Sequence, residues 1–174
     1  MPLLLVQGFL NTIEVADQTD HLADGEVAAA WLRAAGLIGT GSRLSVRELQ
    51  LARDVRAGMR GLLEPGGGEV RPDAGTAALR SLAGDHRARL RVSDAGAVGI
   101  ENARSEDLGD ALFELLLIIH GAQEDGSWSR LHACANPDCR WVFYDRSRNR
   151  QGHWCDMAVC GNRIKNRKLR ARRR

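Results

Sequence analysis

The only four cysteines of the 174-residue chain lie close together, at Cys134, Cys139, Cys155 and Cys160, with the spacing C-x4-C-x15-C-x4-C. Two close pairs separated by about fifteen to twenty residues are typical of a structural zinc site. Each pair can place two sulfurs on one side of an ion, and four thiolates at about 2.3 Å complete a tetrahedron with no open position for water. The spacing predicts one structural Zn²⁺ ion and no catalytic zinc.

Two other uses of four cysteines stay open at this point. Disulfides form in oxidising compartments; the first residues, MPLLLVQGFL, lack a basic segment and a cleavage site for export, so we expect a cytoplasmic protein with reduced thiols. An iron–sulfur cluster also accepts four thiolates, and the number of thiols does not separate the two metals. His132 and His153 flank the cysteines, and we expect neither to be a ligand.

The residues after the last cysteine are strongly basic. Residues 131–174 contain 12 Lys and Arg against 3 acidic residues, a net charge of +9, whereas residues 1–130 contain 13 against 19, a net charge of −6. A basic segment of this kind favours a polyanionic partner. Eight of the twelve residues from Arg163 to Arg174 are basic, and a second basic loop lies between Asp145 and Gln151.

We therefore expect the carboxy-terminal segment to contact nucleic acid. On a helix Arg163, Arg167 and Arg170 would share one face, and asparagine can pair with adenine through two hydrogen bonds. The alternative interpretation is a solvated, frayed tail. The candidate nucleic-acid-binding residues are Arg146, Arg148, Asn162, Arg163, Lys165, Arg167, Lys168 and Arg170.

Hydrophobic spacing predicts a mostly helical region before the cysteines. Weak signals favour a helix over Asn11–Ala16. Asp24 can cap a helix over 25–35 that ends at Gly36, with an inward face of Val27, Ala30, Trp31 and Ala34. The connection that follows contains Gly39-Thr-Gly41, which we interpret as a helix–helix turn and not as a phosphate-binding loop.

The remaining elements follow in order. A capping box, Ser45-Val-Arg-Glu48, starts a helix that reaches about Leu63, and a surface loop over 64–75 leads to a helix over 74–83. "ARLRVSD" and "AVGIEN" predict a hairpin. Ser105 can cap a helix over 106–120, whose apolar face suits either the core or a homodimer interface.

Five of the eight aromatic residues lie near the cysteines and predict a small aromatic core for this segment: Trp128, Trp141, Phe143, Tyr144 and Trp154. "RWVFYD" alternates as a strand does, Asn136-Pro137-Asp138 suits a tight turn inside the first cysteine pair, and the second pair opens a helix. A turn, a hairpin and a helix carrying the last ligands give a treble-clef-like order.

The residues of the helical region indicate no active site, and we do not expect an enzyme. Asp17, Asp20 and His21 fit a solvated polar loop, because no partner triad or metal-ligand spacing lies nearby. His86 and His120 lie at the ends of predicted elements, and we interpret both as structural.

The cysteine segment resembles the CGNR zinc finger over residues 134–170. The motifs are Phe143-x-Asp145-x-Ser147-Arg148 and Trp154-Cys155-x-Met157-x-x-Cys160-Gly161-Asn162-Arg163-x-Lys165. Residues 1–125 resemble the ABATE domain through Phe9-Leu10-Asn11-Thr12, Trp31-Leu32, Gly36-Leu37 and the capped helix from Ser45.

The resemblance implies a bacterial, stress-induced transcription regulator whose finger binds DNA. It also implies that the four cysteines are the zinc ligands, and that Gly161 ends the ligand turn where backbone approaches the metal.

Together these observations predict an α+β protein. A mostly helical domain with a small hairpin, residues 1–125, precedes a treble-clef-like zinc module, residues 130–174. The expected partner is DNA, with a homodimer as a further possibility and no membrane; RNA binding, or a zinc-stabilised adaptor for an acidic protein, are the alternatives. The DNA target, the direction of regulation and the inducing signal do not follow from the sequence.

Overall fold

The computed structural model describes residues 2–63, 74–103 and 107–172. The helices before the cysteines are α1 (Leu3–Leu10), α2 (Gly25–Ala34), α3 (Val46–Gly61), α4 (Ala74–Asp85) and α5 (Leu108–Glu124). The antiparallel hairpins pair β1 (Ile13–Glu14) with β2 (Thr19–Asp20), and β3 (Ala88–Val92) with β4 (Val98–Asn102). The cysteine segment contains a 3-10 turn (Ser127–Arg130), β5 (Leu131–Ala133) paired with β6 (Val142–Tyr144), a π-helical turn (Met157–Gly161) and α6 (Asn162–Arg172).

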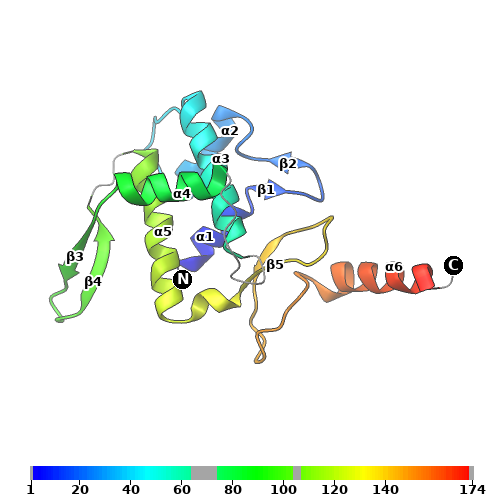
Figure 1. Ribbon diagram of the computed structural model, residues 1–174. Helices are drawn as coiled ribbons and strands as arrows, with labels where there is room; N and C mark the ends of the chain where they lie inside the picture. The colour runs from blue at the N-terminus through cyan, green and yellow to red at the C-terminus, as the bar shows by residue number, and fades with distance from the viewer. Residues whose placement is uncertain (1, 64–73, 104–106, 173–174) are drawn as a thin grey trace.

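The predicted fold class is confirmed: a mostly helical region with small antiparallel hairpins precedes a four-cysteine module (Figure 1). Among the described residues, no helix has both the length and the apolar character that crossing a bilayer requires.

The first helix lies earlier than predicted. Residues 3–10 are helical and residues 13–14 are a strand, so the prediction of a helix over Asn11–Ala16 is wrong. The apolar start of the chain supplies the reason, because Leu3, Val6 and Phe9 recur at helical spacing and are buried in the core. Asn11 is the C-cap of α1.

The two predicted caps of the next helices are present. The Asp24 carboxylate accepts hydrogen bonds from the amides of Glu26 and Val27, and Ser45 and Glu48 form the complete capping box of α3. The inward face predicted for α2 is correct only for Trp31, which packs against the core. Val27, Ala30 and Ala34 are exposed, and the buried residues are Ala28, Ala29 and Leu32. Small residues lie on both sides of this helix, so the packing of the neighbouring elements determines which side is buried.

Helices α3 and α4 cross at two glycines that the sequence analysis did not identify. A Cβ at Gly58 would lie 2.4 Å from the carbonyl oxygen of Gly75, and a Cβ at Gly75 would lie 2.5 Å from the amide nitrogen of Gly58. Such distances exclude any side chain at either position, so these glycines allow the two helix backbones to touch.

Helix α5 is the central helix of the core. Leu112, Leu115 and Ile119 are buried among residues of the other helices. This arrangement assigns the apolar face of the helix to the core, one of the two roles that its sequence left open. Ser105, the predicted cap, and most of the loop predicted over 64–75 lie outside the described residues, and the N-cap of α5 is Asp107.

The predicted β3–β4 hairpin is present and projects from the helical body (Figure 1). Its register pairs Leu90 with Ile100 and Val92 with Val98, which places the four apolar side chains on one face. These side chains are 49–72% exposed. On the other face Glu101 forms ion pairs with Arg89 and Arg91.

The cysteine segment is packed against the helical core. Leu131 of β5 and Val142 of β6 are buried within the same cluster as the helices. The expectation of a separate aromatic core is wrong: none of the five aromatic residues is fully buried, and Trp128 and Tyr144 pack against the helical cluster.

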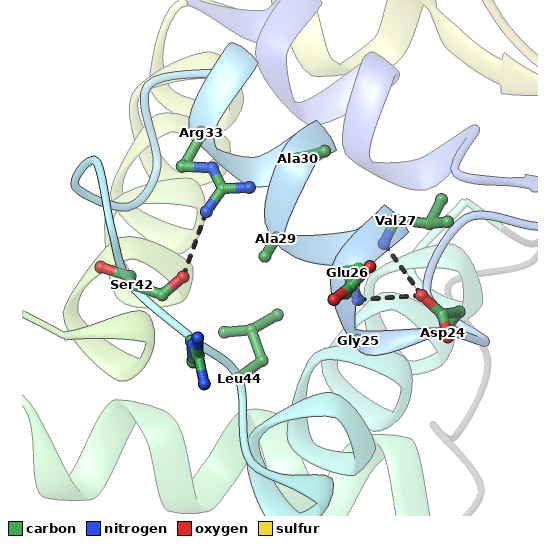
Figure 2. A pocket seen from close by; sticks show the side chains of 10 residues that line it. Asp24, Gly25, Glu26, Val27, Ala29, Ala30, Arg33, Ser42 and Leu44 are labelled. Carbon is green, nitrogen blue, oxygen red and sulfur yellow. Dashed lines mark hydrogen bonds between the residues drawn. The ribbon is translucent and has the colours of Figure 1, made fainter.

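A cleft of about 740 Å³ lies between α2, from its N-cap Asp24 to Arg33, and residues 42–44 (Figure 2). Arg33 crosses it to donate a hydrogen bond to the carbonyl oxygen of Ser42 at 3.2 Å. This contact holds the end of the connection that contains Gly39-Thr-Gly41 against α2, which agrees with a helix–helix turn. None of the predicted zinc or nucleic-acid residues lines this cleft.

Candidate metal centre and basic helix

The first cysteine pair lies on a turn between β5 and β6. The carbonyl oxygen of Asn136 accepts hydrogen bonds from the amides of Cys139, at 2.9 Å, and Arg140, at 3.0 Å. Arg140 has a φ of +55°, a left-handed conformation that reverses the chain after Cys139. The amide of Trp141 donates to the Cys139 sulfur. The tight turn predicted at 136–138 is therefore present, and it directs a backbone N–H to a ligand atom.

The second pair straddles the start of the last helical segment. Cys155 precedes it, and Cys160 lies in the π-helical turn, whose N-cap Asp156 accepts a hydrogen bond from the amide of Val159 at 2.8 Å. The π-helical turn ends at Gly161, and the helical segment then continues directly into α6. A Cβ at Gly161 would lie 2.4 Å from the sulfur of Met157, so the glycine makes room for that side chain.

The four sulfurs converge on one point. All four lie within 4.8 Å of one another, with 3.6 Å between Cys139 and Cys155 and 3.8 Å between Cys155 and Cys160. A tetrahedron with metal–sulfur bonds of about 2.3 Å has sulfur–sulfur edges of about 3.8 Å. A disulfide requires about 2.05 Å, and all four cysteines are free. The donor set and its dimensions suit one structural Zn²⁺ ion.

An iron–sulfur cluster fits this geometry less well. Its thiolates bind several iron atoms, which spreads them farther apart than ligands that share a single ion. The closed set of four sulfurs also leaves no free coordination position. When bound, a zinc ion supplies folding free energy to the segment and no Lewis-acid chemistry.

The surroundings of the thiols determine how readily each one ionises. Burial raises the pKa of the Cys139 and Cys155 thiols. Burial also opposes ionisation of Cys160, but the hydrogen bonds from Asn136 and from the other cysteines outweigh it and lower the pKa of that thiol. Thiols that resist ionisation through burial become thiolates when a metal ion replaces their protons.

Asn136 is a functional residue that the sequence analysis treated only as part of a turn. Its side chain is fully buried, and its Nδ2 donates to the Cys160 sulfur at 3.7 Å. Its Oδ1 accepts from the amide of Asp138 at 3.3 Å. One side chain thus joins the turn of the first pair to a ligand of the second. An amide residue between two ligand cysteines was the only signal for this role.

Asp145 organises the basic loop between the hairpin and the second pair. Its carboxylate accepts hydrogen bonds from the amides of Ser147 at 2.8 Å and Gly152 at 2.7 Å. The hydrogen bonds from Ser147 and Gly152 lower the pKa of Asp145 to about 2. A Cβ at Gly152 would lie 2.9 Å from this carboxylate, so a larger residue there would displace the Asp145 side chain. Arg146 and Arg148 are exposed on the loop that these contacts fix.

Asn11 connects the helical region to the metal centre. Its Nδ2 donates to the carbonyl oxygen of Val142 and its Oδ1 accepts from the amide of Val142, both at 2.8 Å. Arg60 donates to the carbonyl oxygens of Leu10 and Arg140. These bonds fix β6 to the end of α1. Nothing in the local sequence pattern indicated this role for Asn11.

The acidic residues of the first hairpin are not all solvated. Asp20 forms a bidentate ion pair with the buried Arg56, at 2.6 and 2.7 Å, and Arg56 also donates to the hydroxyl of Thr12. Burial alone would raise the pKa of Asp20, but the bonds from Arg56 and from the amide of Leu22 lower it. The prediction of a solvated loop is therefore wrong for Asp20.

Five of the predicted nucleic-acid residues of α6 have exposed side chains: Asn162, Arg163, Lys165, Arg167 and Arg170. This helix extends away from the helical body at the carboxyl end of the chain (Figure 1). Arg163, Arg167 and Arg170 line one groove together with Asn166, as the helical spacing predicted. Ile164 of this helix is buried.

The other predicted nucleic-acid residues of α6 differ in their contacts within the protein. Lys165 is exposed, and Arg167 forms an exposed ion pair with Asp138 at 3.2 Å. Asn162 donates from Nδ2 to the carbonyl oxygen of Ala158 at 3.1 Å, within its own helical segment. The backbone of Lys168 belongs to α6, whereas its side chain, with Arg173 and Arg174, lies outside the described part.

Comparison with protein families matches this architecture in order. The ABATE family model, described as "Putative stress-induced transcription regulator", matches residues 5–130. The model of the CGNR zinc finger matches residues 130–173, which include all four cysteines and α6. No curated protein matches the chain.

Proposed function

The chain belongs to the ABATE family and carries a CGNR zinc finger, and from this premise we propose that it is a transcription regulator that binds duplex DNA through α6 and the 146–150 loop. The observation that carries the proposal is the groove of Arg163, Arg167 and Arg170 on an exposed helix next to the metal centre. We propose a binding role and no catalytic one.

The charge of these side chains supports a phosphate partner. Within the described part of the chain the three arginines of the groove have a single acidic neighbour, Asp138 beside Arg167, and that pair is exposed on both sides. Exposed ion pairs contribute little, so a phosphate can replace Asp138. Arginine binds phosphate through two parallel hydrogen bonds, and each phosphate contact releases condensed counterions.

Zinc has an indirect part in this proposal. Cys160 lies in the π-helical turn that continues into α6. The ion would hold the start of the helix relative to the turn at 136–138 and to β6, and the helix would then have a fixed direction. The basic side chains would contact phosphates, and the zinc would contact only the protein.

The test is duplex-DNA binding of the zinc-loaded chain at several salt concentrations. We expect the logarithm of the affinity to fall linearly with the logarithm of salt, by roughly 0.9 for each phosphate contacted. Replacing Arg163, Arg167 and Arg170 together with Ala should weaken binding and reduce that slope. Removing zinc with a chelator should also abolish binding.

A matched control removes the same charge elsewhere. Arg43, Arg47 and Arg80 are exposed arginines of the helical region, and replacing these three with Ala should leave the salt slope unchanged. Equal losses in both triple variants would attribute binding to net charge alone and contradict the proposal. A salt-independent affinity would contradict it as well.

The alternatives are separated by the same assay. RNA binding predicts tighter capture of single-stranded RNA than of duplex DNA, because unpaired bases stack on aromatic side chains. An adaptor for an acidic protein predicts weak, equal capture of DNA, RNA and heparin. Only preference for duplex DNA over heparin supports our proposal.

We also propose that the protein acts as a homodimer. The observation in favour is the exposed apolar face of β3–β4, formed by Leu90, Val92, Val98 and Ile100. Contiguous exposed apolar side chains mark interaction surfaces. Two copies of this hairpin could bury that face against each other and double the number of basic helices presented to DNA.

A further inference from the structure

A second cluster of potential metal ligands lies in the helical region, away from the four cysteines. It consists of His86, which follows α4, together with Asp107 and Asp110 at the start of α5. One ligand atom from each residue lies within 4.8 Å of the other two. The cluster is built by the junction of α4, the β3–β4 hairpin and α5, and its three residues are far apart in sequence from every cysteine.

The ring of His86 is held with one nitrogen available. Its Nδ1 lies 3.0 Å from the carbonyl oxygen of Leu82. A carbonyl oxygen only accepts, so Nδ1 carries the proton of that bond, and in the neutral ring Nε2 bears the lone pair. This is the arrangement in which histidine ligands are usually held by their surroundings.

Two further contacts fix the ring. It stacks on Phe113 with a centroid distance of 5.6 Å and an angle of 25° between the planes. A Cβ at Gly109 would lie 2.7 Å from Nε2, so the glycine allows the ring to approach the first turn of α5. The direction of Nε2 is thus set by groups outside the cluster.

Asp110 provides the second, independent observation. The residue is only 5% exposed, and its carboxylate accepts no hydrogen bond from any described residue. The ring of His86 lies next to it, with 3.8 Å between Nε2 and Oδ1. The Asp110 side chain is 7% exposed and lines a cavity. A carboxylate that is largely removed from water is stabilised by a cation, so this side chain favours a cationic partner between it and the ring.

The distance of 3.8 Å between His86 Nε2 and Asp110 Oδ1 indicates which kind of cation would fit between them. It is too long for a hydrogen bond. Two ligands that share one metal ion at about 2.0–2.2 Å each can lie up to about 4.2 Å apart. Asp107 adds an exposed carboxylate, whose Oδ1 accepts from the amide of Asp110 at 2.8 Å.

We propose that His86, Asp107 and Asp110 bind a divalent first-row transition-metal ion. An imidazole nitrogen with two carboxylates suits Mn²⁺, Fe²⁺ or Zn²⁺, whereas sulfur ligands would be needed to favour Cu⁺. Three protein ligands leave coordination positions open. These positions face a cavity of about 410 Å³ that Asp85, Arg87 and Ala103 also line.

The ion would connect three elements. His86 follows α4, Asp107 is the N-cap of α5, and Asp110 lies in its first turn. Asn102, the last residue of β4, donates from Nδ2 to the carbonyl oxygen of Asp110 at 2.7 Å. Binding would therefore fix the base of the exposed hairpin, and it gives the helical region a chemical signal that it can detect, the concentration of a divalent metal.

The experiment measures metal content of the full chain, loaded with zinc at the four cysteines and dialysed against Mn²⁺. Mn²⁺ prefers oxygen and nitrogen ligands and does not replace zinc among thiolates. We expect one Zn²⁺ and one Mn²⁺ for each wild-type chain. Asp107→Asn should retain the zinc and lose at least tenfold in Mn²⁺ affinity; this exposed position keeps a good helix cap, so the fold is preserved.

Two more variants and two controls complete the design. His86→Gln and Asp110→Asn should lose Mn²⁺ in the same way, whereas His120→Gln and Asp94→Asn change exposed residues outside the cluster and should bind as the wild type does. A wild-type chain that holds no Mn²⁺ overturns the proposal. Equal Mn²⁺ affinity of the wild type and Asp107→Asn would also overturn it, because His86 and Asp110 would then form an ordinary ion pair with Asp107 beside it.

Discussion

At the scale of single residues, Asn136 shows how a side chain that binds no metal can organise a metal centre. It is fully buried, and it reaches a sulfur of the second cysteine pair from the turn of the first. Partners of this kind orient the ligands, and their loss typically weakens metal binding by roughly 10–100-fold.

We predict such a loss for Asn136→Ala. Zinc affinity, measured by competition with a chromophoric chelator, should fall by roughly 10–100-fold while the helical region keeps its circular dichroism. Asn149 is an exposed residue of the basic loop, and Asn149→Ala should bind zinc as the wild type does. An unchanged zinc affinity of Asn136→Ala would show that Asn136 does not support the metal centre.

Asp145 is a carboxylate whose pKa depends on the hydrogen bonds that it accepts. Its folded-state pKa of about 2 lies below its ordinary value of 3.8. A depressed pKa stabilises the folded state above the ordinary value, and this contribution is lost as the pH falls from about 4 to about 2. At neutral pH the contacts that hold Arg146 and Arg148 in place are therefore complete.

At the scale of elements, the contact between α1 and β6 decides how the metal centre is oriented. Asn11 pairs with both backbone groups of Val142, in the way that a neighbouring strand would. Val142 is buried, so water cannot easily replace this partner.

Asn11→Ala is expected to lower the free energy of unfolding by roughly 1–3 kcal/mol, because it removes the acceptor of the Val142 amide. The Val142 carbonyl oxygen would keep its bond from Gln7. Urea unfolding followed by tryptophan fluorescence measures this change, with Asn149→Ala as the exposed control. A loss below the experimental error would show that the α1–β6 contact does not contribute to stability.

At the scale of the whole molecule, two surfaces project from the helical core. The basic helix α6 extends at the carboxyl end, and the apolar face of β3–β4 projects from the body (Figure 1). The proposed functions assign the first to DNA and the second to another copy of the chain.

The homodimer is tested by changing the apolar face with little effect on the hairpin. Val92 and Val98 form a cross-strand pair, and threonine keeps their branched shape and strand preference. The double variant Val92→Thr, Val98→Thr should sediment as a monomer at a concentration at which the wild type is a dimer. Val46→Thr, at an exposed position of α3, should stay dimeric. A monomeric wild type, or a dimeric double variant, would contradict this interface.

The sequence alone determined the features that depend on local spacing or on side-chain chemistry. The C-x4-C-x15-C-x4-C pattern indicated a zinc centre, and the caps at Asp24 and Ser45 defined the starts of two helices. The arginines of α6 share one face because helical periodicity is a local property. Composition and charge separated a basic carboxy-terminal segment from an acidic region.

Tertiary structure alone decided which surfaces meet. The buried face of α2, the role of Asn11 and the ion pair of Asp20 with Arg56 depend on partners far away in sequence. The same is true of His86, which is a candidate ligand only because the end of α4 lies beside the start of α5. Local periodicity carries no information on such partners, because burial and hydrogen bonding are determined by the packing of the whole chain.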